Sequence, residues 1–538
     1  MKIFQIACTA IVAASVISGC SSSNNAPAPA APSFPRVADL VAQTATITIT
    51  DPTGVGAGPT VAVTSQPADI TVTGSATVLV GVVTLNLKAT NNSGRVISNM
   101  KAVLDAATST LAGASVTASS GTDLAGDDFV SFDVDAVTGY VKSVDKAATA
   151  TAVAMDITTV AATDLSLNFV FPTEDVLVLV GGDFGSRQHT YYTVDSGDGL
   201  PDFEHDGIAH SLNQYSAAAG FRISAPHPDG TKFFLGTRQM PQVVVHDNVT
   251  GKSTHMSIAR DGRAGAIHGL TVSPDSEYLY VSLLDGEHSA PWDGGGTGAR
   301  VWLIKIAIAT MTEVGALELT TDAGGTARLQ DLTITTDGTL GAAPLFFSGQ
   351  VAVVNLADMT LNKYLDVTQV IKTTATPPIS GSAGFKPRHS AISPDGAYVY
   401  VAHQYDYDST TGLEGSLEVY DVPTGTGAAV TLTTYAASSP KGLKFGPDGR
   451  LYYLRNQANP LSIFTFTAAD YSAPTAEIEV VGGTGAYAEV AFGPYGDYYY
   501  TQDNGTTVEQ FDITTDTVTN TITGIGGSRY HVLSVSAY

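Results

Sequence analysis

The chain has 538 residues, so it is long enough for more than one domain, and 43% of its residues are hydrophobic. Only 14% are charged, and the excess of acidic residues gives a net charge of −25. This balance disfavours nucleic-acid binding, because phosphate recognition needs a basic face. A solvated acidic surface accounts for the charge itself.

The first twenty residues have the pattern of an export signal. Lys2 is followed by an apolar stretch from Ile3 to Val16 and then by Ile17-Ser18-Gly19-Cys20. This pattern resembles a bacterial lipoprotein signal, in which small residues precede a cysteine that is lipidated and becomes the new N-terminus. The apolar stretch is shorter than the about 20 residues of a transmembrane helix. We therefore expect residues 1–19 to be a signal peptide and Cys20 to carry the lipid; an ordinary signal peptide with an incidental cysteine is the alternative.

The residues around and after Cys20 indicate where the protein is sent. Cys8 lies inside the signal, so Cys20 is the only cysteine of the mature chain and no disulfide is expected. Ser21 follows Cys20, which by resemblance to enterobacterial sorting favours the outer membrane over the inner one. Residues 20–35 are rich in Ser, Asn, Ala and Pro and are predicted to be a flexible tether. The protein is thus expected in the bacterial cell envelope, held to the membrane only by its lipid anchor.

Residues 36–174 are predicted to form a β-sandwich. They are rich in Thr, Val and Ala, and apolar residues alternate with polar ones at Val82 to Lys88 and at Leu165 to Phe171. Turn signals such as Asn91-Asn92-Ser93-Gly94 separate these strands, as is typical of sandwiches. The segment looks like a bacterial immunoglobulin-like module. It contains no His, Trp or mature Cys, so few of its side chains are suited to catalysis or metal binding.

A Ser-Pro-Asp-Gly turn or a close variant recurs beyond residue 175, each time before aromatic and β-branched residues. The copies start at Ser273, Ser393, His227, Gly446 and Gly493, with a weaker one at Thr336. Proline fixes φ and Asp-Gly supplies the turn, so each copy is expected to join two antiparallel strands. The spacing of the turn prolines, such as Pro228 and Pro274, is in the range of propeller blades of four strands.

The two ends of this region complement one another. Asp175 to Val180 and His189 to Asp195 would supply the later strands of a blade that lacks its first strand, and Tyr530 to Ser536 match a first strand. We predict a seventh blade that both ends close, which removes an open sheet edge. The predicted fold is therefore all-β, with an N-terminal β-sandwich followed by a seven-bladed β-propeller over residues 175–538.

The strand after one of these turns suggests a family. Tyr398-Val399-Tyr400-Val401-Ala402 after the Ser393 turn resembles the YVTN-type β-propeller repeats, which are related to the propeller lactonases. The resemblance covers residues 175–538 and implies the propeller fold. Such propellers include binding proteins, scaffolds and enzymes, so the resemblance does not choose a function. Two copies depart from the motif, since Thr336 replaces the turn proline and Tyr495 the turn aspartate.

Polar residues share one position of the repeats. If the first strand of each blade runs beside the central channel, the residue six before each turn proline occupies the same place in every blade. These residues are Arg222, His268, Gln330, Arg388, Lys441, Ala488 and, by matching the chain ends, His531. Such a ring would suit a small anionic or carbonyl-bearing ligand, and hydrated channel lining is the alternative. Asp331, His389 and Glu489 are expected beside the ring.

Metal sites are only weakly indicated. The chain has no His-x-His or His-Glu-x-x-His spacing, so the histidines near Asp202 and Asp285 are expected to be solvated loop residues. Asp406, Asp408 and Glu414 space their oxygens as in a calcium loop but lack the glycine of the sharp turn. We predict no cofactor, with calcium as the open alternative.

Two functions from different classes follow from these observations. The leading hypothesis is a surface-anchored, non-catalytic propeller that binds a ligand or another envelope protein. The alternative is a lactonase-like hydrolase that acts in the channel, although the sequence has no Gly-x-Ser-x-Gly elbow and no paired-acid signature. A redox enzyme is a third class; the haem-binding Cys-x-x-Cys-His motif is missing from the sequence, and a quinone or copper cofactor is the alternative for this class.

The anchor prediction is tested by replacing Cys20 with Ser. Without the thiol no lipid can be attached, so the variant should appear in the soluble fraction after cell lysis, whereas the parent protein should pellet with membranes. A variant that still pelleted with membranes in high salt would contradict the lipoprotein assignment.

Overall fold

The computed structural model describes the chain from residue 44 to residue 536, with gaps. The residues left out are 1–43, 57, 68, 93–96, 98–99, 123–126, 135–143, 145–146, 160–162, 172–175, 183–188, 196–200, 205–220, 228–231, 238–240, 248–251, 261–264, 286–299, 320–328, 330, 347, 368–385, 405–414, 431–439, 456–460, 468–469, 481–488, 494–497, 503–507, 523–529 and 537–538. Every regular element of the described residues is a strand. Among them there is no helix that is long and apolar enough to cross a membrane.

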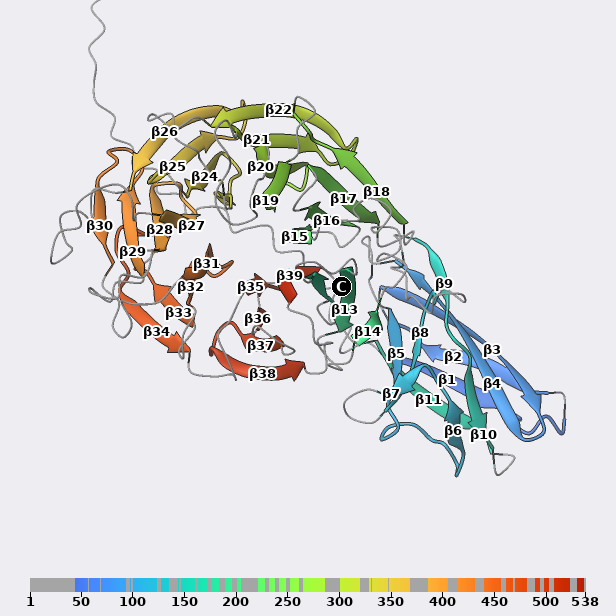
Figure 1. Cartoon of the computed structure of the whole chain (residues 1–538). Coiled ribbons are helices and arrows are strands. Elements are labelled where there is room, and N and C mark those ends of the chain that lie inside the picture. Colours follow the sequence, from blue (N-terminus) through green and yellow to red (C-terminus); the bar gives the residue numbers. More distant parts are fainter. Residues whose placement is uncertain are drawn as a thin grey trace, which may run out of the picture.

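Two antiparallel sheets form the N-terminal sandwich (Figure 1). One has the order β2-β1-β11-β5-β8-β7 and the other the order β3-β4-β10-β6, with β9 paired to β4. Their bounds are β1 (Thr44–Thr50), β2 (Thr60–Ser65), β3 (Ile70–Leu79), β4 (Val82–Asn91), β5 (Lys101–Leu104), β6 (Ser115–Ala118), β7 (Gly121–Thr122), β8 (Asp128–Ser131), β9 (Thr149–Thr151), β10 (Met155–Thr158) and β11 (Leu165–Val170). Alternate residues of β11, such as Leu167 and Phe169, are buried in the core between the sheets.

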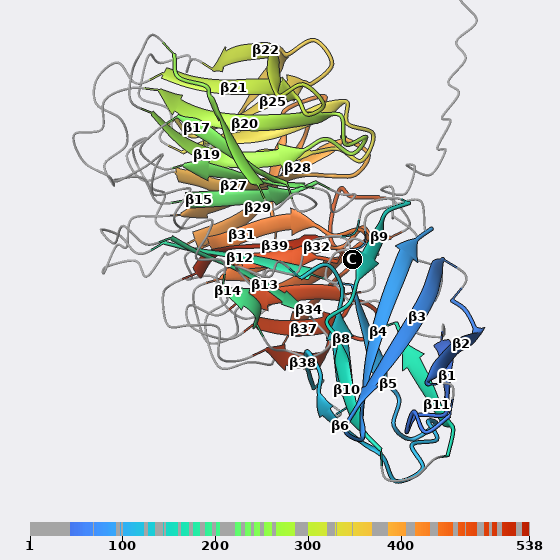
Figure 2. The same cartoon turned by 90° about the vertical axis from the view of Figure 1, so that its right-hand side faces the viewer.

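Seven four-stranded antiparallel sheets follow, arranged as blades around a centre (Figure 1). The first blade consists of β15 (Phe221–Pro226), β16 (Lys232–Thr237), β17 (Gln242–Asp247) and β18 (Lys252–Ser257), and the second of β19 (Gly265–Val272), β20 (Tyr278–Asp285), β21 (Arg300–Ala307) and β22 (Thr312–Leu319). The third consists of β23 (Thr333–Ile334), β24 (Leu340–Leu345), β25 (Gln350–Asn355) and β26 (Thr360–Asp366), and the fourth of β27 (Lys386–Ile392), β28 (Tyr398–Gln404), β29 (Gly415–Asp421) and β30 (Gly427–Ala429). The fifth consists of β31 (Pro440–Phe445), β32 (Leu451–Arg455), β33 (Leu461–Thr465) and β34 (Ala476–Val480), and the sixth of β35 (Glu489–Phe492), β36 (Tyr498–Gln502), β37 (Val508–Asp512) and β38 (Thr517–Ile522). The predicted fold class, a sandwich followed by a seven-bladed propeller, is confirmed. Figure 2 shows the sandwich as a separate unit beside the propeller.

The seventh sheet has the order β14-β13-β12-β39, and we call it the closing blade. Its later strands are β12 (Val176–Gly182), β13 (His189–Asp195) and β14 (Pro201–Glu204), whereas its first strand is β39 (Tyr530–Ser536). β39 pairs antiparallel with β12, with Val178 opposite Ser534. The two ends of the propeller segment are therefore hydrogen-bonded in one sheet, which closes the ring and covers the edge of β12.

The recurring turns have a common hydrogen-bond pattern. The Ser393 hydroxyl donates to Asp395 Oδ1 at 2.5 Å and accepts from the amide of Tyr398 at 2.9 Å. The same two bonds are formed at Ser273. In the weaker copy Thr335 takes the place of the serine, and its hydroxyl donates to Asp337 at 2.6 Å. The motif recurs because each hydroxyl and carboxylate satisfies backbone amides of the turn.

Side chains also tie neighbouring blades together on the face where these turns lie. Lys305 of the blade that starts with β19 donates through Nζ to the carbonyl of Leu356 in the next blade at 2.9 Å. Arg450 donates to the carbonyl of Ile513 in the next blade and pairs with Asp516 at 2.7 Å. Both carbonyls follow the third strand of their blade. The ring is thus held by polar bonds between blades as well as by apolar packing.

Removing the last strand tests the role of closure. Deleting residues 530–538 should expose the edge of β12 and lower the melting temperature by about 5 °C, since several kcal/mol are lost and each shifts a domain of 150 to 250 residues by about 2 to 4 °C and a larger domain by less. Differential scanning calorimetry gives the measurement.

Deletion of residues 537–538 alone is the matched control, because these residues follow β39. A melting temperature that stayed unchanged in the longer deletion would show that pairing of the chain ends does not stabilise the ring.

Candidate functional site

The first strand of five blades carries a one-residue β-bulge at an equivalent place. In four of these strands the pairing register shifts across a single residue that has no partner on the second strand. In the closing blade Tyr530 pairs with Gly181 and Val532 with Val180, so His531 is the extra residue. The five extra residues are Arg222, His268, Arg388, Lys441 and His531. We call this position the ring register.

The blade that starts with β23 follows the same plan. Leu329 pairs with Leu345 and Thr333 pairs with Ala342, so three residues separate these two pairs in the first segment and two residues separate them in the second. One residue of the first strand is again in excess. Gln330, the predicted member of the ring in this blade, lies outside the described residues, as does Ala488 in the blade of β35.

Bulges change where side chains point, which is why they are frequent next to binding and active sites. Next to the bulge, the chains of neighbouring blades also come close to one another. A Cβ atom on Gly269, next to His268, would lie 3.3 Å from Asp331 Cα of the following blade. The bulge therefore places the ring register where adjacent blades converge.

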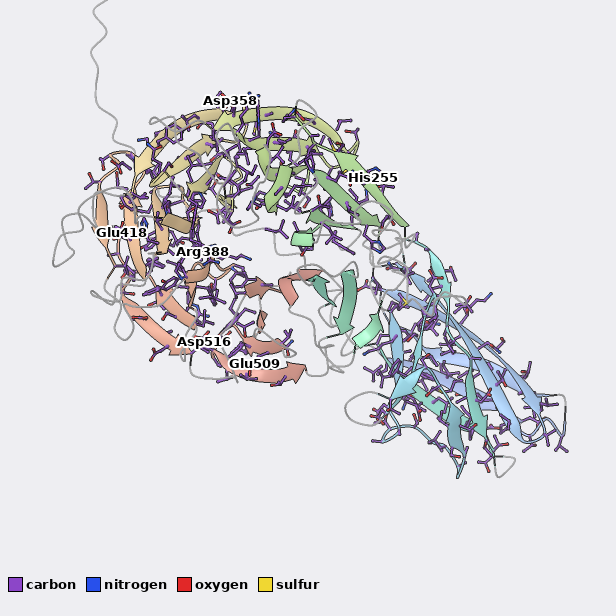
Figure 3. The ribbon with its side chains drawn as sticks, in the orientation of Figure 1. His255, Asp358, Arg388, Glu418, Glu509 and Asp516 are labelled. Carbon is purple, nitrogen blue, oxygen red and sulfur yellow. The ribbon has the colours of Figure 1, made fainter. Side chains whose placement is uncertain are left out.

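Arg388 and His268 are the two members of the ring register whose side chains the structure describes. Figure 3 shows Arg388 on the side of its blade that is nearest the centre of the ring. Burial lowers the pKa of its guanidinium, which nevertheless stays protonated at neutral pH. His268 is more deeply buried, with 3% of its surface exposed. The ring register thus holds a charged group from which water is partly withdrawn.

His389 and Asp331 join two neighbouring blades beside Arg388. His389 Nδ1 lies 4.0 Å from Asp331 Oδ2, too far for a direct hydrogen bond. Neither ring nitrogen of His389 has a hydrogen-bond partner among the described residues. Burial lowers the pKa of His389, Asp331 opposes that shift, and the cations Arg388 and Lys444 add to it. A ligand group or a water would complete the hydrogen bonds of this imidazole.

Lys444 extends the site to a third blade, and the sequence analysis missed it. Its Nζ donates to the carbonyl of Val490 in the following blade at 3.1 Å. It stands three residues after Lys441 on β31, and a second basic residue on a first strand is the signal that could have revealed it. Asp331, Arg388, His389 and Lys444 together form what we call the inner polar cluster.

The remaining predicted site residues divide into two groups. The strands that carry Arg222, Lys441, Glu489 and His531 are described, whereas their side chains are not. Cys20 and the weak calcium candidates Asp406, Asp408 and Glu414 lie outside the described residues. Within the described part of the chain, no group of three or more His, Cys, Asp or Glu side chains could hold a metal ion.

A second pair of a histidine and a carboxylate lies inside a blade. His403 Nε2 is 3.3 Å from Glu418 Oε2, and both side chains are buried. The hydroxyl oxygen of Tyr420 lies within hydrogen-bonding distance of two acceptors, the Glu418 carboxylate and, at 2.9 Å, the carbonyl of Val367. Tyr420 packs with apolar residues of the preceding blade. We interpret this group as a polar part of the core rather than a ligand site.

Comparison with known proteins yields likenesses of structure alone. No protein-family model matches the sequence, and no curated protein matches it. The hydrazine synthase of Kuenenia stuttgartiensis is 16% identical with a TM-score of 0.38 over 55% of this chain and 76% of that chain. The β-propeller domain of Cps50 (Swd1) from Myceliophteria thermophila is 15% identical with a TM-score of 0.42 over 58% of this chain and 89% of that chain. At these values neither likeness says anything about activity.

The lowered pKa of His389 predicts a dependence of stability on pH. Below the ordinary pKa of 6.5 the unfolded chain binds a proton that the folded protein resists, so stability should fall as the pH drops through this range. A His389→Gln variant should lose less stability than the parent between pH 7.5 and pH 5.5, as measured by urea unfolding.

The control for this comparison is His255→Gln, because His255 is exposed on β18. It should retain the pH dependence of the parent. If His389→Gln and the parent lost stability equally, burial of His389 would not be a source of the dependence.

Proposed function

We propose that the protein is a lipid-anchored protein of the bacterial envelope whose propeller binds a small anionic or carbonyl-bearing ligand, without catalysis, at the ring register. One observation carries the proposal: the equivalent bulges of five blades hold three cationic residues and two histidines. The whole chain has only 26 Lys and Arg against 51 Asp and Glu. Closing a propeller does not require basic side chains at these bulges, so ligand binding is the better explanation of them.

The inner polar cluster indicates which groups such a ligand presents. Arg388 is partly dehydrated, which lowers the pKa of its guanidinium, and an anionic oxygen beside it would stabilise the buried positive charge. His389 and Asp331 lie beside it and supply a ring nitrogen and an acceptor. A carboxylate or phosphate next to a hydroxyl group would complement this set.

The location rests on the lipoprotein-like signal ending at Cys20 and on the tether at residues 20–35. The propeller itself supports binding in general, because its blades form a rigid frame for loops and channel residues. An envelope protein is a second class of partner, and it would dock on the rim of the propeller rather than at the ring register.

Calorimetric titration with citrate, and separately with inorganic phosphate, tests the proposal. Wild-type protein should bind at least one of these anions. The double variant Arg388→Ala/His268→Ala should bind it at least about tenfold more weakly, because a hydrogen bond to a charged group contributes about 1.5 to 3 kcal/mol.

The matched control is Arg300→Ala/His255→Ala, which removes the same residue types from outer parts of the blades. It should bind like wild type, and both double variants should keep a cooperative melting transition. Equal weakening in the two double variants, or no binding by wild type, would contradict the proposal. Lactone hydrolysis that only the ring variant lost would favour the hydrolase instead.

A further inference from the structure

The most exposed large apolar side chains of the described residues gather at one end of the sandwich. Val55, Leu79 and Val80 are 86%, 77% and 94% exposed, whereas the next most exposed, Val314, is at 54%. We call Val55, Leu79 and Val80 the sandwich tip. Single exposed apolar residues are ordinary on protein surfaces, but a group of them at one place marks an interaction site.

Two neighbouring turns build the sandwich tip. Leu79 pairs with Val82 where the hairpin of β3 and β4 reverses. The turn that contains Val55 lies beside this hairpin, because a Cβ on Gly54 would be 3.5 Å from the side chain of Val78. Figure 1 shows that this hairpin reverses at the end of the sandwich that points away from the propeller.

The hairpin keeps Val80 in an unfavourable conformation. Its φ is 50° and that of Gly81 is 76°, so both central residues of the turn are left-handed. Asn-Gly is the usual pair in such a turn, and a β-branched residue at positive φ is strained. Turns at Met311 and Met359 also hold a non-glycine residue at positive φ, but neither of these residues is β-branched. Val80 is 94% exposed, so packing within the sandwich does not account for a valine at this place, whereas a contact outside the sandwich would.

The charge around the sandwich tip narrows the choice of partner. The described residues of the turns at this end are 51–56, 58–59, 79–82, 111–114, 159 and 163–164, and none of them is Lys or Arg. Their acidic residues are Asp51 and Asp164. Asp51 already accepts a hydrogen bond from the amide of Gly56 at 2.9 Å, and Asp164 accepts one from the amide of Asp51 at 3.4 Å. The tip is therefore apolar, and the charges beside it are these two carboxylates, each of which accepts a backbone hydrogen bond.

We propose that the sandwich tip inserts into the surface of a lipid bilayer. Three side chains are too few for a stable protein interface, which needs roughly 800 Å² from each partner. They suffice as a second, weak contact for a protein that a lipid already holds at the membrane. The inference rests on the lipid anchor that we propose at Cys20, and it does not depend on the ligand site.

The length of the chain before β1 allows this contact. Thr44 begins β1, and the Val55 turn follows the other end of that strand, so the tip lies about one strand length from where the tether enters the sandwich. The ten residues of β3 span roughly 33 Å. Residues 20–43 reach up to about 80 Å when extended. An anchor at Cys20 would therefore leave the tip free to meet the membrane.

A fluorescent label tests the proposal in the chain from residue 20 onward, with Cys20→Ser and an N-terminal His-tag that a nickel-chelating lipid in the vesicles holds at the membrane in place of the lipid anchor. A polarity-sensitive dye is attached at Val80→Cys or, as the control, at Val314→Cys on β22. With phosphatidylcholine vesicles the emission of the Val80 label should shift to shorter wavelength, and nitroxides on the upper acyl chain should quench it. The control label should not respond.

A second labelled protein separates insertion from an effect of the dye. With the dye at Val55→Cys, the vesicle-induced shift should occur in the parent and disappear when Leu79→Ser and Val80→Asn are added. Asn suits the turn, so these changes should not lower the melting temperature. No shift at Val80, an equal shift of the control label, or a shift without vesicles that grows with protein concentration would each overturn the proposal. The last result would point to self-association instead.

Discussion

Pairing of β39 with β12 is the constraint on which the propeller depends. Six blades are each continuous in sequence, and the closing blade alone takes strands from both ends of the segment. Once it forms, the first strands of all blades face a common centre, and equivalent positions become neighbours. His531 enters the ring register only through β39. Closure therefore both stabilises the ring and completes the site that we propose.

The fold could be predicted because its signals are local. The turns at Ser273 and Ser393 recur as sequence since their hydroxyl and carboxylate groups bond within the turn itself. The register of Arg388 could be counted from the same turn, because the hairpin fixes the distance along the strand. The β-bulge at Arg388 could not be predicted from the sequence, because it depends on how the first strand pairs with the second strand. Lys444 was missed for a related reason, since its partner, the carbonyl of Val490, belongs to another blade.

Residue type alone also does not distinguish a candidate ligand site from a polar part of the protein core. His389 with Asp331 and His403 with Glu418 are both a histidine near a carboxylate, yet the first pair lies between two neighbouring blades and the second lies within one blade. Only packing distinguishes them. The sandwich is a second case in which the sequence does not reveal a candidate site. Its sequence has few side chains suited to catalysis or metal binding, and only the folded hairpin shows that Val80 is exposed.

The central claim is that the ring register and the inner polar cluster attract anions. Anomalous diffraction from a crystal soaked in sodium bromide tests it most directly, since bromide can be located without knowledge of the natural ligand. The account predicts a bromide peak within hydrogen-bonding distance of Arg388, near His389 and Lys444. Peaks confined to the outer surface of the blades, with none at this level of the ring, would contradict it.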